Sequence, residues 1–182
     1  MRYWHPFIKD TVETISEDRV KKLIVLSLYP HYSKATTGSA FIEFRRALNG
    51  KPIEAIYIEH WYNFSPYIEA LIEAIEDGLA EFKERDVSVL FSAHSLPEDF
   101  IIHGDPYVEH IKKTIKEINK RLSLKWYLSF QSKSGPVRWL SPTTEEVIVE
   151  LADANCRNLL IVPISFVSDH IETLYEIDVL YK

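Results

Sequence analysis

The segment LLIVPISFVSDHIETLYEID, residues 159–178, starts apolar and turns acidic. Its first part, 159–164, is typical of a buried strand, because it is short, apolar and rich in branched side chains. The second part carries His170, Glu172 and Glu176 among several other polar residues. In open parallel sheets, ligands bind beyond the carboxyl ends of the strands. The segment therefore predicts a sheet strand that leads directly into a functional site.

The rest of the chain repeats this alternation of apolar runs and amphipathic helices. Strands are predicted at 23–28, 53–58, 87–91 and 125–130, and helices at 65–82, 105–122 and 142–154. Ser65 and Asp105 are expected to cap the first two of these helices, each followed by a proline. Alternating strands and helices favour an α/β fold with parallel sheets. The turn at 49–52, Asn-Gly-Lys-Pro, is predicted to be the boundary between two lobes.

Composition excludes several classes of protein. The chain has 182 residues, a formal charge of −6 and no long Lys/Arg block, which argues against a nucleic-acid partner. The single cysteine, Cys156, can form neither an internal disulfide nor a multi-thiolate metal site. No apolar run approaches the roughly 20 residues of a membrane-spanning helix, and the first residues lack the pattern of a signal peptide. A cytoplasmic protein is expected.

His94 and the acidic segment are the candidates for chemistry. His94 follows a predicted buried strand, where it can accept protons from a ligand or simply bond to a loop carbonyl. Asp169 and Glu172 have the spacing of a capping box, which is one explanation of the acids. Alternatively, Glu172 and Glu176 share one helix face beside His170 and form a path for a metal ion. Both hypotheses stay open from the pattern alone.

Aromatic and basic residues in the other loops allow two interpretations as well. Tyr3, Trp4, Tyr32 and Trp139 can wall a flat apolar ligand or belong to the core. Lys133 and Arg138 can pair with ligand carboxylates or be solvated.

Several motifs, taken in order, resemble the ferrochelatase family, whose members insert ferrous iron into a porphyrin at the end of haem synthesis. They are SAHSLP (92–97), GDPY (104–107), QSK-GP--WL-P-T-E (131–146) and PI-F-SDHIETLYE-D (163–178), preceded by MRYWHPFI (1–8) and YPHYSKATTGS (29–39). The resemblance implies Rossmann-like, three-layer lobes with parallel sheets and a porphyrin cleft between them. It assigns residues 1–50 to the end of the first lobe and 51–182 to most of the second, whose final elements are missing.

The resemblance also implies roles for individual residues. His94 matches the proton acceptor or metal contact, and Glu172 matches the acid opposite it, so both are expected to be catalytic and metal-binding. His170 and Glu176 match the metal or proton path. The positions that match porphyrin contacts are Arg2, Tyr3, Tyr32, Gln131, Ser132, Lys133 and Trp139.

The implied substrates are ferrous iron and protoporphyrin IX, giving protohaem. Coproporphyrin III as substrate, a related tetrapyrrole chelatase and an inactive tetrapyrrole- or metal-binding remnant are the alternatives. No cofactor beyond Fe²⁺ and no iron–sulfur cluster is expected, because the cysteine cluster of some members is absent. The family suggests a cytoplasmic protein attached peripherally to the inner membrane. The family's opening LLNLGGP-like segment is also absent, so the chain is expected to be a fragment or a truncated form.

Overall fold

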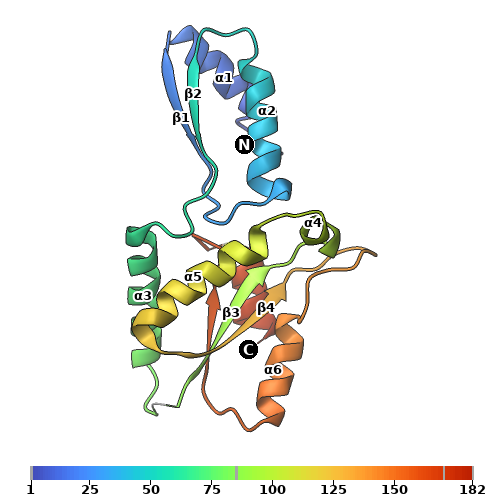
Figure 1. The fold of residues 1–182 in the computed structure, drawn as a ribbon. Helices are drawn as coiled ribbons and strands as arrows, with labels where there is room; N and C mark the ends of the chain where they lie inside the picture. Colours follow the sequence, from blue (N-terminus) through green and yellow to red (C-terminus); the bar gives the residue numbers. More distant parts are fainter. Residues whose placement is uncertain (1, 85, 170, 182) are drawn as a thin grey trace. The chain divides into compact units, whose positions relative to one another are not determined.

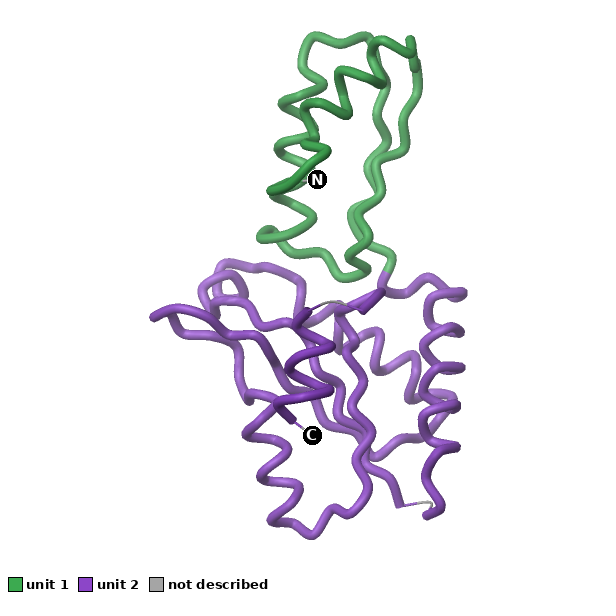
Figure 2. The backbone as a smooth tube through the Cα atoms, turned by 180° about the vertical axis from the view of Figure 1, so that it is seen from behind, with its two compact units in different colours: residues 1–61 green, residues 62–182 purple. Residues whose placement is uncertain are grey.

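The computed structural model describes residues 2–84, 86–169 and 171–181, which form two compact units, 1–61 and 62–182. Figure 1 shows the elements in chain order and Figure 2 shows the two units. The predicted α/β class with parallel sheets is confirmed. Each unit has its own sheet and is described separately.

Unit 1 consists of helices packed on one face of a small parallel sheet. Along the chain it contains α1 (Ile8–Glu17), β1 (Lys22–Leu26), the π-helical segment η1 (Lys34–Gly38), α2 (Ser39–Leu48) and β2 (Glu54–Ile58). β1 and β2 pair in register from Lys22 opposite Glu54 to Leu26 opposite Ile58. Phe41 and Phe44 of α2 pack their rings against Tyr57 of β2, which places α2 on the Tyr57 face.

The boundary between the units differs from the predicted one at 50/51. The structure divides the chain after Trp61. The physical reason is strand pairing: β2 follows the Asn-Gly-Lys-Pro turn and pairs with β1, so 51–61 stays with the first unit. The assignment of the two units to the two lobes of the family stays a prediction.

Unit 2 contains a parallel sheet with helices on both faces. Its elements are α3 (Ser65–Ala80), β3 (Ser88–His94), α4 (Glu98–Ile102), α5 (Tyr107–Leu122), β4 (Lys125–Gln131), α6 (Thr144–Asp153), β5 (Leu159–Pro163) and the π-helical segment η2 (Thr173–Leu180). The strand order is β4-β3-β5, so β3 is central. Leu90 of β3 packs with Val147 and Leu151 of α6, while α3 and α5 cover the other face (Figure 1).

The helix starts follow local hydrogen bonding. Helix α5 begins one residue later than predicted, with Pro106 and not Asp105 at its N-cap, and the Asp105 carboxylate accepts the Tyr107 backbone N–H at 3.0 Å from just before it. Thr143 and Glu146 form a reciprocal capping box at the start of α6. The predicted Ser65 cap is wrong: Ser65 lies inside α3, and its hydroxyl donates to the Glu69 carboxylate at 2.8 Å.

Candidate functional site

His94 stands at the carboxyl end of the central strand. The preceding residues of β3 are all buried, whereas the His94 side chain is 36% exposed. Its register partner is Gln131, the last residue of β4, and Ser165 lies two residues past the end of β5. The three strand ends therefore bring their polar residues together at the sheet edge where α/β proteins bind ligands.

Two neighbouring segments fix the His94 backbone. Its N–H donates to the Ser165 hydroxyl oxygen at 2.7 Å, and its carbonyl accepts the Tyr107 hydroxyl at 2.9 Å. Burial raises the pKa of the Tyr107 hydroxyl well above its ordinary value, so the phenol keeps its proton and remains a donor. Because the Asp105 carboxylate accepts the Tyr107 backbone N–H at the same helix start, the GDPY motif couples the position of α5 to that of His94.

The His94 ring pairs with Glu172. Its Nδ1 lies 3.0 Å from Glu172 Oε2, and the Phe166 ring packs edge-on at a centroid distance of 6.1 Å. An ionised carboxylate only accepts hydrogen bonds, so beside ionised Glu172 the hydrogen of neutral His94 sits on Nδ1. The Nε2 lone pair then remains available to a proton or a metal ion. The Glu172 side chain is 30% exposed, so both groups can be reached from solution.

Glu176 is held next to this pair by two donors at the end of β4. Gln131 Nε2 lies 3.1 Å and Ser132 Oγ lies 2.9 Å from Glu176 Oε2. Ser132 adopts a left-handed backbone conformation with φ of 64°, which is uncommon for a residue with a side chain and recurs at functional sites. Glu176 belongs to η2, and π-helical segments are likewise frequent at such sites.

The other predicted site residues have separate surroundings. In unit 1, Arg2 pairs with Glu43 at 3.1 Å, and the exposed Tyr3 lies under its guanidinium. Tyr32 is half-buried, and its hydroxyl lies close to Gly38. A Cβ atom at position 38 would lie 2.7 Å from this hydroxyl oxygen, so the glycine leaves room for the Tyr32 side chain.

In unit 2, Lys133 is exposed and Trp139 is half-buried. The Trp139 indole Nε1 is buried and has no hydrogen-bond partner within the described part of the chain. The predicted His170 lies outside the described residues. Within residues 2–84, 86–169 and 171–181, no group of three or more metal-ligating side chains gathers closely enough to hold an ion.

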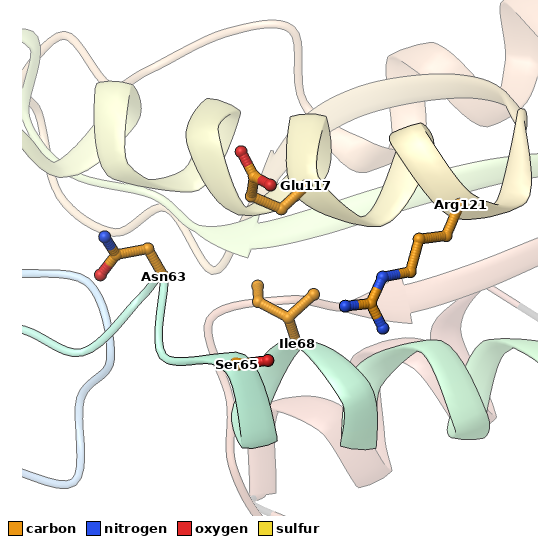
Figure 3. Close-up of a pocket in the computed structure, with 5 residues that line it drawn as sticks. All are labelled: Asn63, Ser65, Ile68, Glu117 and Arg121. Carbon is orange, nitrogen blue, oxygen red and sulfur yellow. The ribbon is translucent and has the colours of Figure 1, made fainter.

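Two surface hollows occur elsewhere in unit 2. One, of about 300 Å³, lies between α3 and α5, where Arg121 and Glu117 face Asn63, Ser65 and Ile68 (Figure 3). The second, of about 330 Å³, lies between α4 and the loop that contains Val137 and Arg138. Neither is lined by His94, Glu172 or Glu176. Along the described chain, no helix is both long and apolar enough to cross a bilayer.

The site thus consists of a histidine–carboxylate pair with a further acid beside it, at the carboxyl edge of a parallel sheet. In an α/β protein, such side chains can transfer protons or contact metal ions. The family model for ferrochelatase matches residues 1–182, and the chain belongs to the ferrochelatase family. It is 51% identical to the ferrochelatase of Geotalea uraniireducens and 46% identical to that of Aquifex aeolicus. The alignments cover 100% of this chain but only 58% and 60% of these relatives.

The ferrochelatase of a Synechococcus species is 45% identical, again over the whole chain and 55% of the relative. This chain thus spans a little more than half the length of these relatives.

Proposed function

We propose that this protein inserts ferrous iron into a porphyrin in haem synthesis. The observation that carries the proposal is the His94 Nδ1 to Glu172 Oε2 contact of 3.0 Å at the end of the central strand. The family membership supports it, because the relatives that match the whole chain are named ferrochelatases.

Metal insertion requires that two pyrrole N–H protons leave while a divalent cation enters the ring. His94 accepts a pyrrole proton on Nε2, and Glu172 stabilises the imidazolium that results. Glu176 adds negative charge that offsets the arriving cation and receives protons on their way to solvent. The contacts that fix the His94 backbone hold its ring still during the transfer. The same groups can serve as metal contacts before the ring is loaded, with His170 as a further member of the metal or proton path.

The proposed porphyrin contacts are residues of several segments, carried over from the family resemblance. Gln131 and Ser132 would contact the macrocycle from the end of β4, where they also hold Glu176. The buried indole N–H of Trp139 offers a donor that the described protein atoms leave unused. Aromatic faces supply contact area for a flat ring. The remaining members of the proposed set are Arg2, Tyr3, Tyr32 and Lys133.

Protoporphyrin IX is the proposed porphyrin, and coproporphyrin III is the alternative. The second carries more carboxylates, so it needs more basic or hydrogen-bonding partners. Initial rates of metal insertion, measured separately with each porphyrin across a concentration series, decide between them. A higher kcat/KM for protoporphyrin IX supports the proposal, and a higher value for coproporphyrin III contradicts this part of it.

The protein is proposed to need no prosthetic group beyond its iron substrate. Cys156 is a single half-buried thiol whose Sγ donates to the Asn158 carbonyl at 3.4 Å. Metal-insertion activity should therefore survive Cys156→Ser, and its loss without a change in folding would contradict this.

A cytoplasmic location with peripheral attachment to the inner membrane is proposed on the family resemblance. Co-sedimentation with vesicles of inner-membrane lipid tests the attachment.

Glu172→Gln tests whether the acid acts in the reaction or only in the helix start. The amide keeps the shape but cannot stabilise an imidazolium, so metal insertion should slow by at least about 100-fold. The melting temperature should stay near that of the wild type. The rate is followed by loss of free-porphyrin fluorescence with Fe²⁺ or Zn²⁺. Glu145→Gln, at an exposed acid in the first turn of α6, is the control. A lower melting temperature with a retained rate would support the capping explanation instead.

A further inference from the structure

A line of buried polar side chains lies beneath the site and leads to Gln131. Ser92 of β3, Ser129 and Gln131 of β4 and Thr144 of α6 are each at most 2% exposed. The Ser92 hydroxyl lies 2.6 Å from Gln131 Oε1 and 2.8 Å from Thr144 Oγ1. Thr144 Oγ1 in turn lies 2.9 Å from Ser129 Oγ. These contacts tie both strands and α6 to one glutamine side chain.

The direction of every hydrogen bond in this line follows from chemistry. An amide oxygen can only accept, so Ser92 must donate its single hydroxyl hydrogen to Gln131. The contact between Ser92 and Thr144 then requires Thr144 as the donor. By the same step, Ser129 donates to Thr144. All three hydroxyl groups therefore point their hydrogens toward the Gln131 amide oxygen, an arrangement in which each bond polarises the next.

Acceptors on one side of Gln131 and the Ser92 hydroxyl on the other hold its amide in one orientation. Because Ser92 holds the oxygen, the NH₂ group points outward, where it donates to Glu176 Oε2 at 3.1 Å and lies 3.4 Å from the Glu172 carbonyl oxygen. The reversed amide would set its oxygen against the Glu176 carboxylate. The hydroxyl line could run in either direction, because each hydroxyl both donates and accepts, so the acceptors at Glu176 and at the Glu172 carbonyl select the observed orientation. Ser92 thus anchors the amide oxygen while the NH₂ group holds Glu176.

We propose that Ser92 is a positioning residue that acts through Gln131 to hold the Glu176 carboxylate in one orientation beside the His94–Glu172 pair. The inference deepens the proposed function and rests on it, since it gives Glu176 a use in metal traffic. Residues that orient ligands from behind in this way typically change metal affinity or activity by about 10- to 100-fold when mutated. Ser92 itself touches neither substrate.

The test compares two buried serines on the same strand. Ser92→Ala removes the donor to Gln131. Ser88→Ala is the matched control, because Ser88 is 1% exposed and pairs in register with Lys125, at the other end of β4 from Gln131. The first readout is metal-insertion kinetics at varied Zn²⁺ and at varied porphyrin. Ser92→Ala should lower kcat/KM for the metal about tenfold with the KM for porphyrin unchanged. Ser88→Ala should change neither, and equal losses in the two variants would overturn the proposal.

A second readout does not need activity. The Gln131 side-chain NH₂ group gives a nuclear magnetic resonance signal, which is assigned by its disappearance in Gln131→Glu. In the wild type, the hydrogens of this NH₂ group should exchange slowly with solvent. Ser92→Ala should make this exchange at least about tenfold faster, since the amide can then rotate, and Thr144→Val should have a smaller effect of the same sign. An unchanged exchange rate of the Gln131 NH₂ hydrogens in Ser92→Ala would overturn the positioning role of Ser92. A wild type that inserts no metal contradicts the proposed function separately, because the signal still reports whether Ser92 holds Gln131.

Discussion

The two parallel sheets of this molecule differ in how they are covered. In unit 1, β1 and β2 alternate between half-buried and exposed residues, and Ile24 and Ile56 are 67% and 56% exposed on the same face. In unit 2, Val89, Leu90 and Phe91 of the central strand are fully buried. Parallel sheets in proteins are ordinarily covered on both faces. Unit 2 follows this rule within the described residues, and unit 1 leaves an apolar face open.

The difference bears directly on function. A sheet covered on both faces can bury polar side chains that hydrogen-bond to one another, as those of Ser92 and Gln131 do. An open sheet face offers no such environment, and its apolar residues add surface that favours association with another chain. The contacts that define the candidate site come from the covered sheet and the segments that follow it.

The largest contrast is expected between Leu90→Ala and Ile24→Ala. Leu90 packs between β3 and α6, so its truncation should cost about 2–5 kcal/mol in the free energy of unfolding. Ile24 is largely exposed, so its truncation should change stability by no more than about 0.5 kcal/mol. Urea unfolding of the two variants gives both values. If Leu90→Ala and Ile24→Ala lowered the free energy of unfolding by similar amounts at low protein concentration, the sheet face around Ile24 would have to be covered in solution.

Tyr107→Phe tests the link between α5 and the covered sheet. Loss of the hydrogen bond to the His94 carbonyl should cost about 1 kcal/mol. Burial raises the Tyr107 pKa above its ordinary value of 10.0, so its contribution is complete below pH 10 and is lost as pH rises further. The variant should therefore lose less stability than the wild type between pH 10 and 12. Tyr175→Phe, at an exposed position, is the control. Identical alkaline profiles for Tyr107→Phe and the wild type would contradict the assignment.

Thr143→Ala tests the opposite face, which α6 covers. Removing the cap should cost about 1 kcal/mol. Hydrogen bonds from the Thr143 backbone N–H and, secondly, from its side chain lower the Glu146 pKa, so the stabilisation from this carboxylate is present above its ordinary pKa of 4.5 and is lost as pH falls through the lowered value. Thr143→Ala keeps the backbone N–H and removes only the part that comes from the side chain. Thermal unfolding at pH 7 and pH 3 should show a larger difference between variant and wild type at pH 7. An equal difference at both pH values would mean that the Thr143 side chain does not contribute to lowering the Glu146 pKa.

The smallest effect on stability is expected from charging the open face of unit 1. Ile24→Lys combined with Ile56→Lys should change the free energy of unfolding by less than about 1 kcal/mol, because both side chains are already exposed. It should lower any self-association of the chain, since it breaks an apolar patch. Sedimentation velocity over a concentration series measures this. Val149→Lys, at an exposed position on α6, should leave association unchanged, and an equal effect of both substitutions would contradict a role for this face.

The sequence predicts the strands well because they depend on local pattern, whereas the role of the site residues stays a prediction. The apolar run 159–164 becomes β5, and His94 and Glu172 lie where strands and loops meet at the carboxyl edge. The partners of these residues are less predictable. The Tyr107 phenol reaches the carbonyl of His94, and Gln131 reaches Glu176, only after strands and helices pack. Likewise the π-helical form of η2 depends on tertiary context, since its sequence is also that of an ordinary helix.

The most direct test of the whole account is metal insertion by the purified protein and by its His94→Ala variant, followed by loss of free-porphyrin fluorescence with Fe²⁺ or Zn²⁺. Porphyrin binding, measured by fluorescence without metal, shows whether the variant still takes up its substrate. The account predicts that the variant binds porphyrin but inserts metal at least about 100-fold more slowly. Near-wild-type turnover by His94→Ala would contradict the assignment of His94 as the proton acceptor.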